Sequence, residues 1–258
     1  VVGVRTDQGE IGCEAVALCA GQWSRQVGKM AGVTVPLFSA EHFYIVTKKI
    51  AGVTPDLPVM RAFRKTELDV LFRMLERGLS SPWTSSAGRL FDGVAAILDL
   101  GHWTRFEGQA AMALEFAASE EAADPDPSVQ QPYTIPLRPA QRNEPHAPRH
   151  ELDWEPMIRA LLQDRARGIS ASLSALRFHL ALVEGIVEVA RTAGERQVVL
   201  GGGCFQNRLL TELLVPRLER EGFRVAWPQR IPPNDGGIAL GQIAVALERR
   251  AAQRREPV

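Results

Sequence analysis

The sequence predicts an α/β fold on three observations. Apolar residues recur at helical spacing in several long segments, which indicates amphipathic helices. Residues 1–47 are expected to be β-rich, because Val1–Thr6 alternates apolar and polar positions and a turn candidate follows it. Near the C-terminus, short apolar runs alternate with helical segments. That order predicts a sheet covered by helices.

Composition is ordinary for a globular protein and excludes some partners. The 258 residues are 45% hydrophobic and 23% charged, which allows one or two domains. Because 30 Lys and Arg balance 30 Asp and Glu, no net field favours nucleic acid or membrane lipid. No run reaches the roughly 20 apolar residues of a membrane span. Cys13, Cys19 and Cys204 are spaced for neither a disulfide framework nor a metal knuckle. We therefore expect a cytoplasmic location.

The first part of the chain is expected to be β-rich. It begins Val1-Val2-Gly3-Val4, without an initiator Met or a basic signal region, and so looks like the interior of a longer protein. Turn residues at Asp7-Gln8-Gly9 favour a hairpin. The expected elements are strands at 1–6 and 11–20, a helix at 23–30 and a strand at 43–47.

The middle and the end of the chain are expected to be mainly helical. Ser85-Ser86 is a candidate N-cap for one of these helices. Seven prolines between residues 120 and 150 predict a loop, with one short strand at Tyr133–Leu137. The expected helices are 67–79, 87–98, 109–119, 155–165, 172–192, 209–220 and 238–250, and the expected late strands are 198–200 and 223–227.

Two short motifs predict contacts with a phosphorylated ligand. Gly201, Gly202 and Gly203 follow the expected strand and precede a helical segment that begins near Asn207. Glycine lets backbone N–H groups approach a ligand, and a helix that begins there would turn unpaired N–H groups toward an anion. In the second motif, Asn234-Asp235-Gly236-Gly237, the side-chain oxygens could cap a helix or hold a metal ion. A plain tight connection between strand and helix remains the alternative for the glycine turn.

Five segments resemble the final lobe of the carbamoyltransferase HypF family, in order and at family spacing. The resemblance covers about residues 66–250. This lobe is in turn similar to TsaD, the tRNA threonylcarbamoyladenosine synthase. The resemblance implies an actin-like ATPase (ASKHA) fold. The segments are Ser85-Ser-Ala-Gly-Arg-Leu-Phe-Asp-Gly-Val-Ala95, Phe106-Glu-Gly-Gln-Ala-Ala-Met112, Arg177-Phe-His179, Gly202-Gly-Cys-Phe-Gln-Asn-Arg208 and Pro232-Pro-Asn-Asp-Gly-Gly-Ile-Ala-Leu-Gly-Gln242.

The resemblance implies a reaction and a set of site residues. In [NiFe]-hydrogenase maturation, ATP and carbamoyl phosphate give a carbamoyl-adenylate, and the carbamoyl group passes to the C-terminal Cys thiol of a HypE-type partner. A divalent metal, Zn or Fe, assists in the intact family. The implied roles are nucleotide binding by Gly201, Gly202, Gly203 and Asn207, metal binding by Asp235, and a catalytic cleft lined by Glu107 and Gly108.

One departure from the family pattern indicates an incomplete enzyme. The family's His-x-x-x-His metal pair belongs to a preceding lobe. His146 and His150 have that spacing, but they lie in the Pro-rich loop without the flanking motif. We therefore expect that this chain does not carry out the complete reaction.

Residues 1–61 resemble a middle segment of FAD-dependent dimethylglycine and sarcosine dehydrogenases. The segments that carry the resemblance are 2–11, 19–24, 35–37 and 42–44, together with Thr47. It implies that Ala20 and Gly21 lie near a flavin, but the dinucleotide fingerprint GxGxxG is missing, so FAD binding is not expected. We predict two domains, 1–64 and 65–258, in an apparent chimera. A gene fusion, a truncated locus and an assembly error all remain open.

Several singled-out residues also have purely structural interpretations. Asp235 could act only as an N-cap, and Glu107 could be a solvated loop residue. Arg89 and Asp92, three apart on a helix, could form a surface pair. His179 is expected to be a packed core histidine, and Cys204 has no base beside it. Three functions stay open: a carbamoyltransferase, a flavin-dependent amine dehydrogenase, and a non-catalytic fragment that binds nucleotide.

Overall fold

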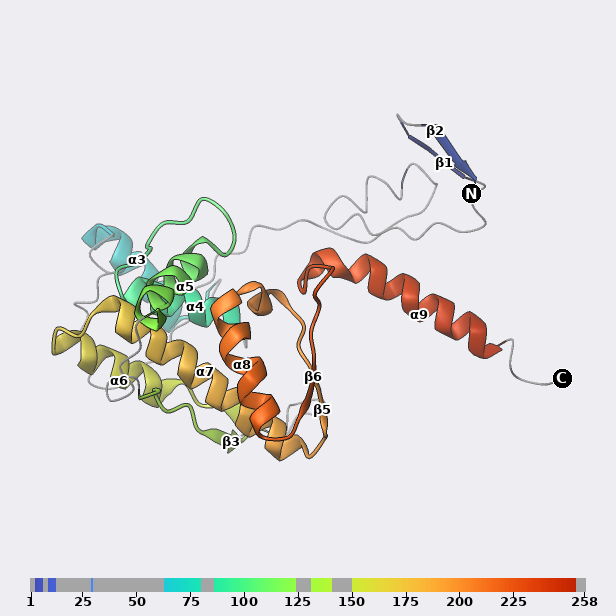
Figure 1. The fold of residues 1–258 in the computed structure, drawn as a ribbon. Coiled ribbons are helices and arrows are strands. Elements are labelled where there is room, and N and C mark those ends of the chain that lie inside the picture. The colour runs from blue at the N-terminus through green and yellow to red at the C-terminus, as the bar shows by residue number, and fades with distance from the viewer. Residues whose placement is uncertain are drawn as a thin grey trace. The chain divides into compact units, whose positions relative to one another are not determined.

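The computed structural model describes residues 3–6, 9–12, 29, 63–79, 86–123, 131–140 and 150–253. The chain divides into two compact units, Phe43–Pro228 and Val1–His42 with Gln229–Val258. The larger unit holds most of the helices, as Figure 1 shows. The predicted helix at 23–30 (apart from Lys29) and the predicted strand at 43–47 lie outside the described residues, as do Ala20 and Gly21.

The helices of the larger unit gather around α7 (Ala171–Ala193), the longest of them. This helix packs against α5, α6 and α8, and α4 packs in turn against α5 (Figure 1). The other helices of the unit are α3 (Lys65–Glu76), α4 (Ala87–Ile97), α5 (Gln109–Ala122), α6 (Glu155–Ala166) and α8 (Arg208–Arg220).

Local capping fixes where two of these helices begin and where one ends. The Ser86 hydroxyl accepts a hydrogen bond from the Arg89 amide at the start of α4, as the sequence predicts. The Ser170 hydroxyl accepts from the Leu173 amide at 3.1 Å at the start of α7. Gly194 ends α7 with a positive φ of 72°, a conformation that glycine adopts without a Cβ clash. These caps satisfy backbone groups that a helix end leaves unpaired.

One continuous apolar core joins α4, α5, α6, α7 and α8. Each helix contributes the face that its apolar spacing predicts. Phe91 of α4 meets Phe178 of α7 edge to face, with ring centroids 4.9 Å apart. The side chains with no or almost no exposure include Val94, Leu114, Met157, Leu161, Leu176, Phe178, Leu210, Leu214 and Leu218.

In the described part of the larger unit, the strands are short and form two separate pairs. β3 (Leu137–Pro139) runs antiparallel to β4 (His150–Leu152). β5 (Gln197–Val199) runs parallel to β6 (Arg224–Ala226), with α8 as the crossover between them (Figure 1). This β5–α8–β6 unit confirms the predicted order of strand, turn, helix and strand.

The structure corrects the strand predicted at Tyr133–Leu137. Only Leu137 belongs to β3, and β4 was not predicted. Tyr133 is held instead by side-chain bonds, because its hydroxyl donates to Asp164 at 3.0 Å. Arg177 pairs with the same carboxylate at 2.5 Å. Burial raises the pKa of Tyr133 to about 12. The segment around Tyr133 is therefore held by a buried polar cluster and not by the hydrogen bonds of the expected strand.

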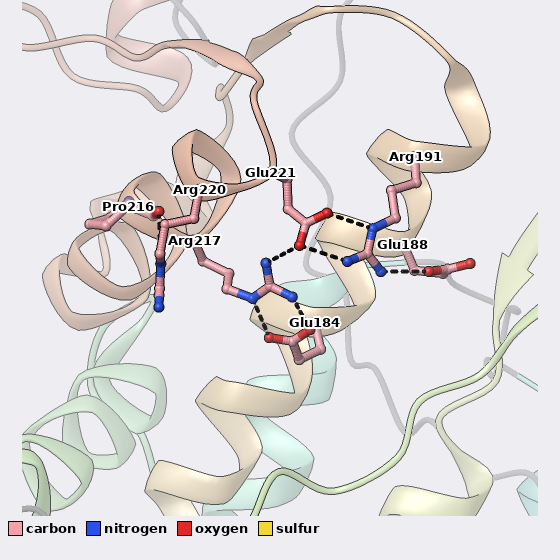
Figure 2. Close-up of polar contacts among 7 residues, drawn as sticks. All are labelled: Glu184, Glu188, Arg191, Pro216, Arg217, Arg220 and Glu221. Atoms are coloured by element: carbon pink, nitrogen blue, oxygen red, sulfur yellow. Dashed lines mark hydrogen bonds and ion pairs between the residues drawn. The ribbon is translucent and has the colours of Figure 1, made fainter.

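A network of charged side chains ties the C-terminal half of α7 to the end of α8 (Figure 2). The Arg217 guanidinium donates to both carboxylate oxygens of Glu184, at 2.8 and 3.0 Å, and to Glu221 at 2.6 Å. Arg191 donates to Glu221 and Glu188. Hydrogen bonds from Arg217 and then Arg191 lower the pKa of Glu221. Because two arginines share Glu221, the ends of the two helices are held side by side.

Within its described residues, the smaller unit contains a hairpin and a long helix. β1 (Gly3–Thr6) and β2 (Gly9–Gly12) pair antiparallel with Thr6 opposite Gly9, which confirms the predicted hairpin. The described part of the second strand is shorter than the predicted 11–20, whose remainder lies outside the described residues. A 3₁₀ turn, η3 (Asp235–Gly237), leads into α9 (Ile238–Gln253). Among the described residues, every helix is too short or too polar to cross a membrane.

The core predicts a large contrast between two positions on α5. Leu114 is fully buried and Phe116 is 60% exposed. Leu114→Ala should lower the free energy of unfolding by about 2–5 kcal/mol, because it leaves a cavity. Phe116→Ala is the matched control and should change it by no more than about 0.5 kcal/mol. Urea denaturation of the two variants measures both values. Equal effects would show that this core is wrongly placed.

Candidate functional site

The glycine turn lies at the carboxyl end of β5 and is open. Gly201, Gly202 and Gly203 are all exposed. A Cβ built on Gly201 or Gly202 would meet no atom within 4 Å. Gly202 has a φ of 102°, which L side chains rarely adopt, so this position requires glycine. No side chain therefore plugs the turn, and its backbone is accessible to a ligand.

The strand that leads into the turn is buried on one face. Leu200 is 3% exposed, but Val199 is 71% exposed. Within the described residues β5 pairs with β6, and its side chains alternate between two faces. The Leu200 amide donates to the Ala226 carbonyl at 2.9 Å and so continues the pairing to the edge of the turn.

The predicted start of the following helix is confirmed, because α8 begins at Arg208 with Asn207 as its N-cap. A 3₁₀ turn that was not predicted, η2 (Gly203–Gln206), lies between the first two glycines and this helix. Within η2, the Phe205 amide donates to the Gly202 carbonyl at 3.1 Å and the Asn207 amide donates to the Cys204 carbonyl at 3.2 Å. α4 packs against this segment.

The first N–H groups of α8 already have partners inside the protein. The Glu115 carboxylate of α5 accepts from the Arg208 amide at 2.7 Å and from the Leu209 amide at 3.3 Å. The Asn207 side chain accepts from the Leu210 amide at 2.7 Å. A carboxylate therefore occupies the position where the sequence predicts an external anion. The open N–H groups of the glycine turn remain for a ligand.

Asn207 joins the turn to the long helix α7. It is 8% exposed. Its amide nitrogen lies 2.9 Å from Nε2 of His179, which is fully buried. Nδ1 of His179 lies 2.8 Å from the Ala175 carbonyl, one turn earlier on α7. The prediction of a packed core histidine is confirmed. The predicted contact of Asn207 with ribose or phosphate stays a prediction, since one oxygen lone pair and one N–H remain unused.

Burial strongly affects the charge of this histidine. Loss of water around the ring lowers the pKa of His179 from 6.5 to about 4, although the Ala175 carbonyl opposes the shift. The imidazole is therefore neutral near pH 7. A neutral ring has one donor and one acceptor nitrogen, which is what its two partners require.

Glu107 and Gly108 lie at the start of α5. Gly108 is the N-cap residue and has a positive φ of 81°. Glu107 is exposed, and its charge acts on Asp92 of α4. Burial first, and then the charge of Glu107, raise the pKa of Asp92, and Arg89 opposes both. Arg89 and Asp92 form the predicted pair at 2.8 Å. Asp92 is thus paired with one cation and also senses the charge of a second carboxylate.

Asp235 belongs to the smaller unit, whereas Glu107, Gly108, Asn207 and the glycine turn belong to the larger one. Asp235 is exposed at the start of η3. Asn234 is the capping residue there, because its side chain accepts from the Gly236 amide at 3.1 Å. A Cβ on Gly237 would lie 2.6 Å from the Pro232 carbonyl, so this position needs glycine. Within the described ranges, no three His, Cys, Asp or Glu side chains are grouped to hold a metal ion.

Cys204 follows the glycines but does not have the surroundings of a nucleophile. It is half-buried and packs against the core. Burial raises the pKa of its thiol, which disfavours the reactive thiolate. The sequence missed Glu115, whose contact with α8 spans 93 residues. A glutamate in the middle of a helix gives no local signal of such a contact.

The buried histidine predicts a pH dependence of stability. Between about pH 6.5 and about pH 4 the unfolded chain binds a proton that the folded chain excludes, so stability falls as the pH falls. Between about pH 7 and about pH 5 this costs about 2 kcal/mol. Urea denaturation should show this loss in the unchanged protein and a smaller one in His179→Phe. Equal losses in both would contradict a neutral buried His179.

Comparison with known proteins gives two separate similarities. A family model described as carbamoyltransferase, Kae1-like domain, second subdomain, matches residues 29–242. Carbamoyltransferase HypF of Synechocystis sp. is 39% identical over 181 residues, which are 70% of this chain and 22% of that protein. The 4-methylaminobutanoate oxidase (formaldehyde-forming) of Paenarthrobacter nicotinovorans is 49% identical over 61 residues, 24% of this chain and 7% of that enzyme.

A solved structure supports the first similarity. The crystal structure of a full-length HypF in its phosphate- and nucleotide-bound form superposes with a TM-score of 0.63 at 31% identity. The match covers 73% of this chain and 28% of that one. This chain thus spans about a quarter of the full-length relative. The predicted boundary at residues 64 and 65 stays a prediction, since the family model begins at residue 29. The chain belongs to the family of the HypF C-terminal lobe, the second subdomain of the carbamoyltransferase Kae1-like domain.

Proposed function

We propose that this chain supplies the nucleotide-binding lobe of an ATP-dependent carbamoyltransferase. Its substrates are ATP and carbamoyl phosphate by way of a carbamoyl-adenylate, and its acceptor is the C-terminal Cys thiol of a HypE-type partner in [NiFe]-hydrogenase maturation. Membership of the HypF family supports the transferase class. The matched structure that contains phosphate and nucleotide supports the ligand class.

The open glycine turn is the observation that carries this proposal. Gly201 and Gly202 leave free space on the side where a Cβ would stand. Consecutive backbone N–H groups in such a turn can donate to phosphate oxygens without a side chain in the way. Glu115 already neutralises the positive end of α8, so the phosphate contacts fall to Gly201–Gly203 and the spare N–H of Asn207.

The other predicted residues take supporting roles. Glu107 and Gly108 line the cleft beside the carbamoyl group. In the transfer, the partner's thiolate forms a bond to the carbamoyl carbon, the bond to the adenylate oxygen breaks, AMP leaves, and the thiol proton goes to solvent. Asp235 would supply one ligand to a divalent metal. A lone exposed carboxylate does not make a metal site, so no step here depends on the metal.

The similarity to an amine oxidase is the basis of a second candidate, a flavin-dependent dehydrogenase. The sequence identity of this match is high, but the match covers only 7% of that enzyme. The expected flavin contacts, Ala20 and Gly21, lie outside the described residues. A fragment that binds nucleotide without catalysis is the third. The carbamoyltransferase lobe has the broader support, since it accounts for the longer match and for the open turn.

Replacing one glycine tests the proposal. Gly201→Val should lower the affinity for a non-hydrolysable ATP analogue at least about tenfold, because the side chain fills the open space over the turn. Gly201 lacks the positive φ of Gly202, so valine adds bulk without the same backbone strain. Isothermal titration calorimetry of the full chain measures the affinity.

The matched control is Gly93→Val on α4. Gly93 is also exposed, and its Cβ would also meet open space. This variant should bind like the unchanged protein, and both variants should keep its unfolding midpoint. Unchanged affinity in Gly201→Val would remove the turn from the site. Absence of binding by the unchanged protein would contradict the proposed function itself.

A further inference from the structure

We propose that His179 is a positioning residue of the nucleotide site. Its neutral ring, with the proton on Nδ1, orients the Asn207 amide and thereby holds the glycine turn in the form that receives the ligand. This role rests on the proposed function. Its geometry stands apart from it, so the two can be tested separately.

The hydrogen bonds fix the tautomer of His179. The Ala175 carbonyl can only accept, and it lies 2.8 Å from Nδ1, so Nδ1 carries the proton. A neutral ring then has its lone pair on Nε2. That lone pair lies 2.9 Å from the amide nitrogen of Asn207, which donates to it.

The other end of Asn207 imposes the same orientation. The Leu210 amide can only donate, and it lies 2.7 Å from the Asn207 side-chain oxygen. Rotating the amide by half a turn would place two donors face to face at Leu210 and two acceptors face to face at His179. Both contacts are buried. A buried polar group without a partner costs about 1–3 kcal/mol, so a single orientation dominates.

Backbone contacts carry this constraint to the glycine turn. The backbone N–H of Asn207 closes η2 by donating to the Cys204 carbonyl. The backbone N–H of Phe205 donates to the carbonyl of Gly202. The Asn207 carbonyl accepts from the amide and the hydroxyl of Thr211, which fixes the same residue to α8. A continuous set of hydrogen bonds therefore runs from Ala175 on α7 to Gly202.

Packing alone does not explain a histidine here. The ring is held edge-on by Phe91 and Phe178, each with its centroid 5.6 Å away. A phenylalanine ring would satisfy those contacts and would spare the cost of burying two polar nitrogens. The histidine differs from it only in the two bonds that lead to Ala175 and Asn207. Those bonds are the basis of the positioning role.

Two substitutions separate positioning from packing. His179→Phe keeps an aromatic ring but removes both ring nitrogens. The Asn207 side-chain amide then keeps its bond from Leu210 but loses its buried acceptor, so it is no longer held at both ends. We expect the affinity of this variant for a non-hydrolysable ATP analogue to fall about tenfold or more. His179→Gln restores an acceptor for Asn207 in its side-chain oxygen, and its affinity should stay within about threefold of the unchanged protein. Calorimetry of the full chain measures both.

Leu161→Ala is the control for a purely structural effect. Leu161 lies on α6 and is fully buried, so its loss lowers stability without touching Asn207. It should bind the analogue normally at a temperature where all variants are folded. If His179→Phe binds as well as the unchanged protein, or if Leu161→Ala weakens binding equally, the positioning role is wrong.

Nitrogen-15 NMR of the imidazole tests the geometry without any ligand. The expected spectrum has a protonated Nδ1 and an unprotonated Nε2 near neutral pH. A proton on Nε2 would overturn the inference. If the unchanged protein binds no nucleotide, the proposed function fails, but the tautomer and the hydrogen exchange of the Phe205 and Asn207 amides still decide the positioning role. Exchange should quicken in His179→Phe and not in His179→Gln, and equal exchange would contradict it.

Discussion

The hydrogen bond between His179 and Asn207 is the constraint on which the candidate site depends. It joins residues 28 positions apart and fixes the start of α8 against α7. Because the backbone N–H of Asn207 also donates to Cys204 and closes η2, this contact holds the residue at which the turn after the glycines ends. The ion-pair network of Arg217, Glu221 and Arg191 holds the other end of the same two helices (Figure 2). The segment that contains the glycine turn is therefore held in place by its attachment to α7 and α8. Binding of a phosphate to such a pre-ordered turn costs little conformational entropy.

The Glu115 carboxylate changes where an anion can bind. A helix that follows a glycine turn usually offers its N-terminus to phosphate, but here a carboxylate from α5 takes two of those N–H groups. A second negative charge at that point would be repelled. The electrostatics thus favour the glycine backbone over the helix end. The same contact ties α5, which begins at the predicted cleft residues Glu107 and Gly108, to the element that follows the turn.

Local sequence signals predict the helices, whereas long-range contacts determine the geometry of the site. The starts of α4 and α7 follow from apolar spacing and serine caps, which act over a few residues. The strand at Tyr133 was misplaced because a buried cluster with Asp164 and Arg177 replaces the ladder, and no local pattern reports it. The glycine turn was predictable from composition. The inserted η2 and the occupied end of α8 were not, since Glu115 lies 93 residues away.

The central claim is that the glycine backbone, and not the helix end, receives the nucleotide phosphate. Backbone amide NMR of the full chain, titrated with a non-hydrolysable ATP analogue, tests it most directly. The account predicts the largest shifts at Gly201, Gly202 and Gly203, with little change at Arg208 and Leu209, whose amides stay bonded to Glu115. Shifts concentrated at Arg208 and Leu209, with none in the glycine turn, would contradict it.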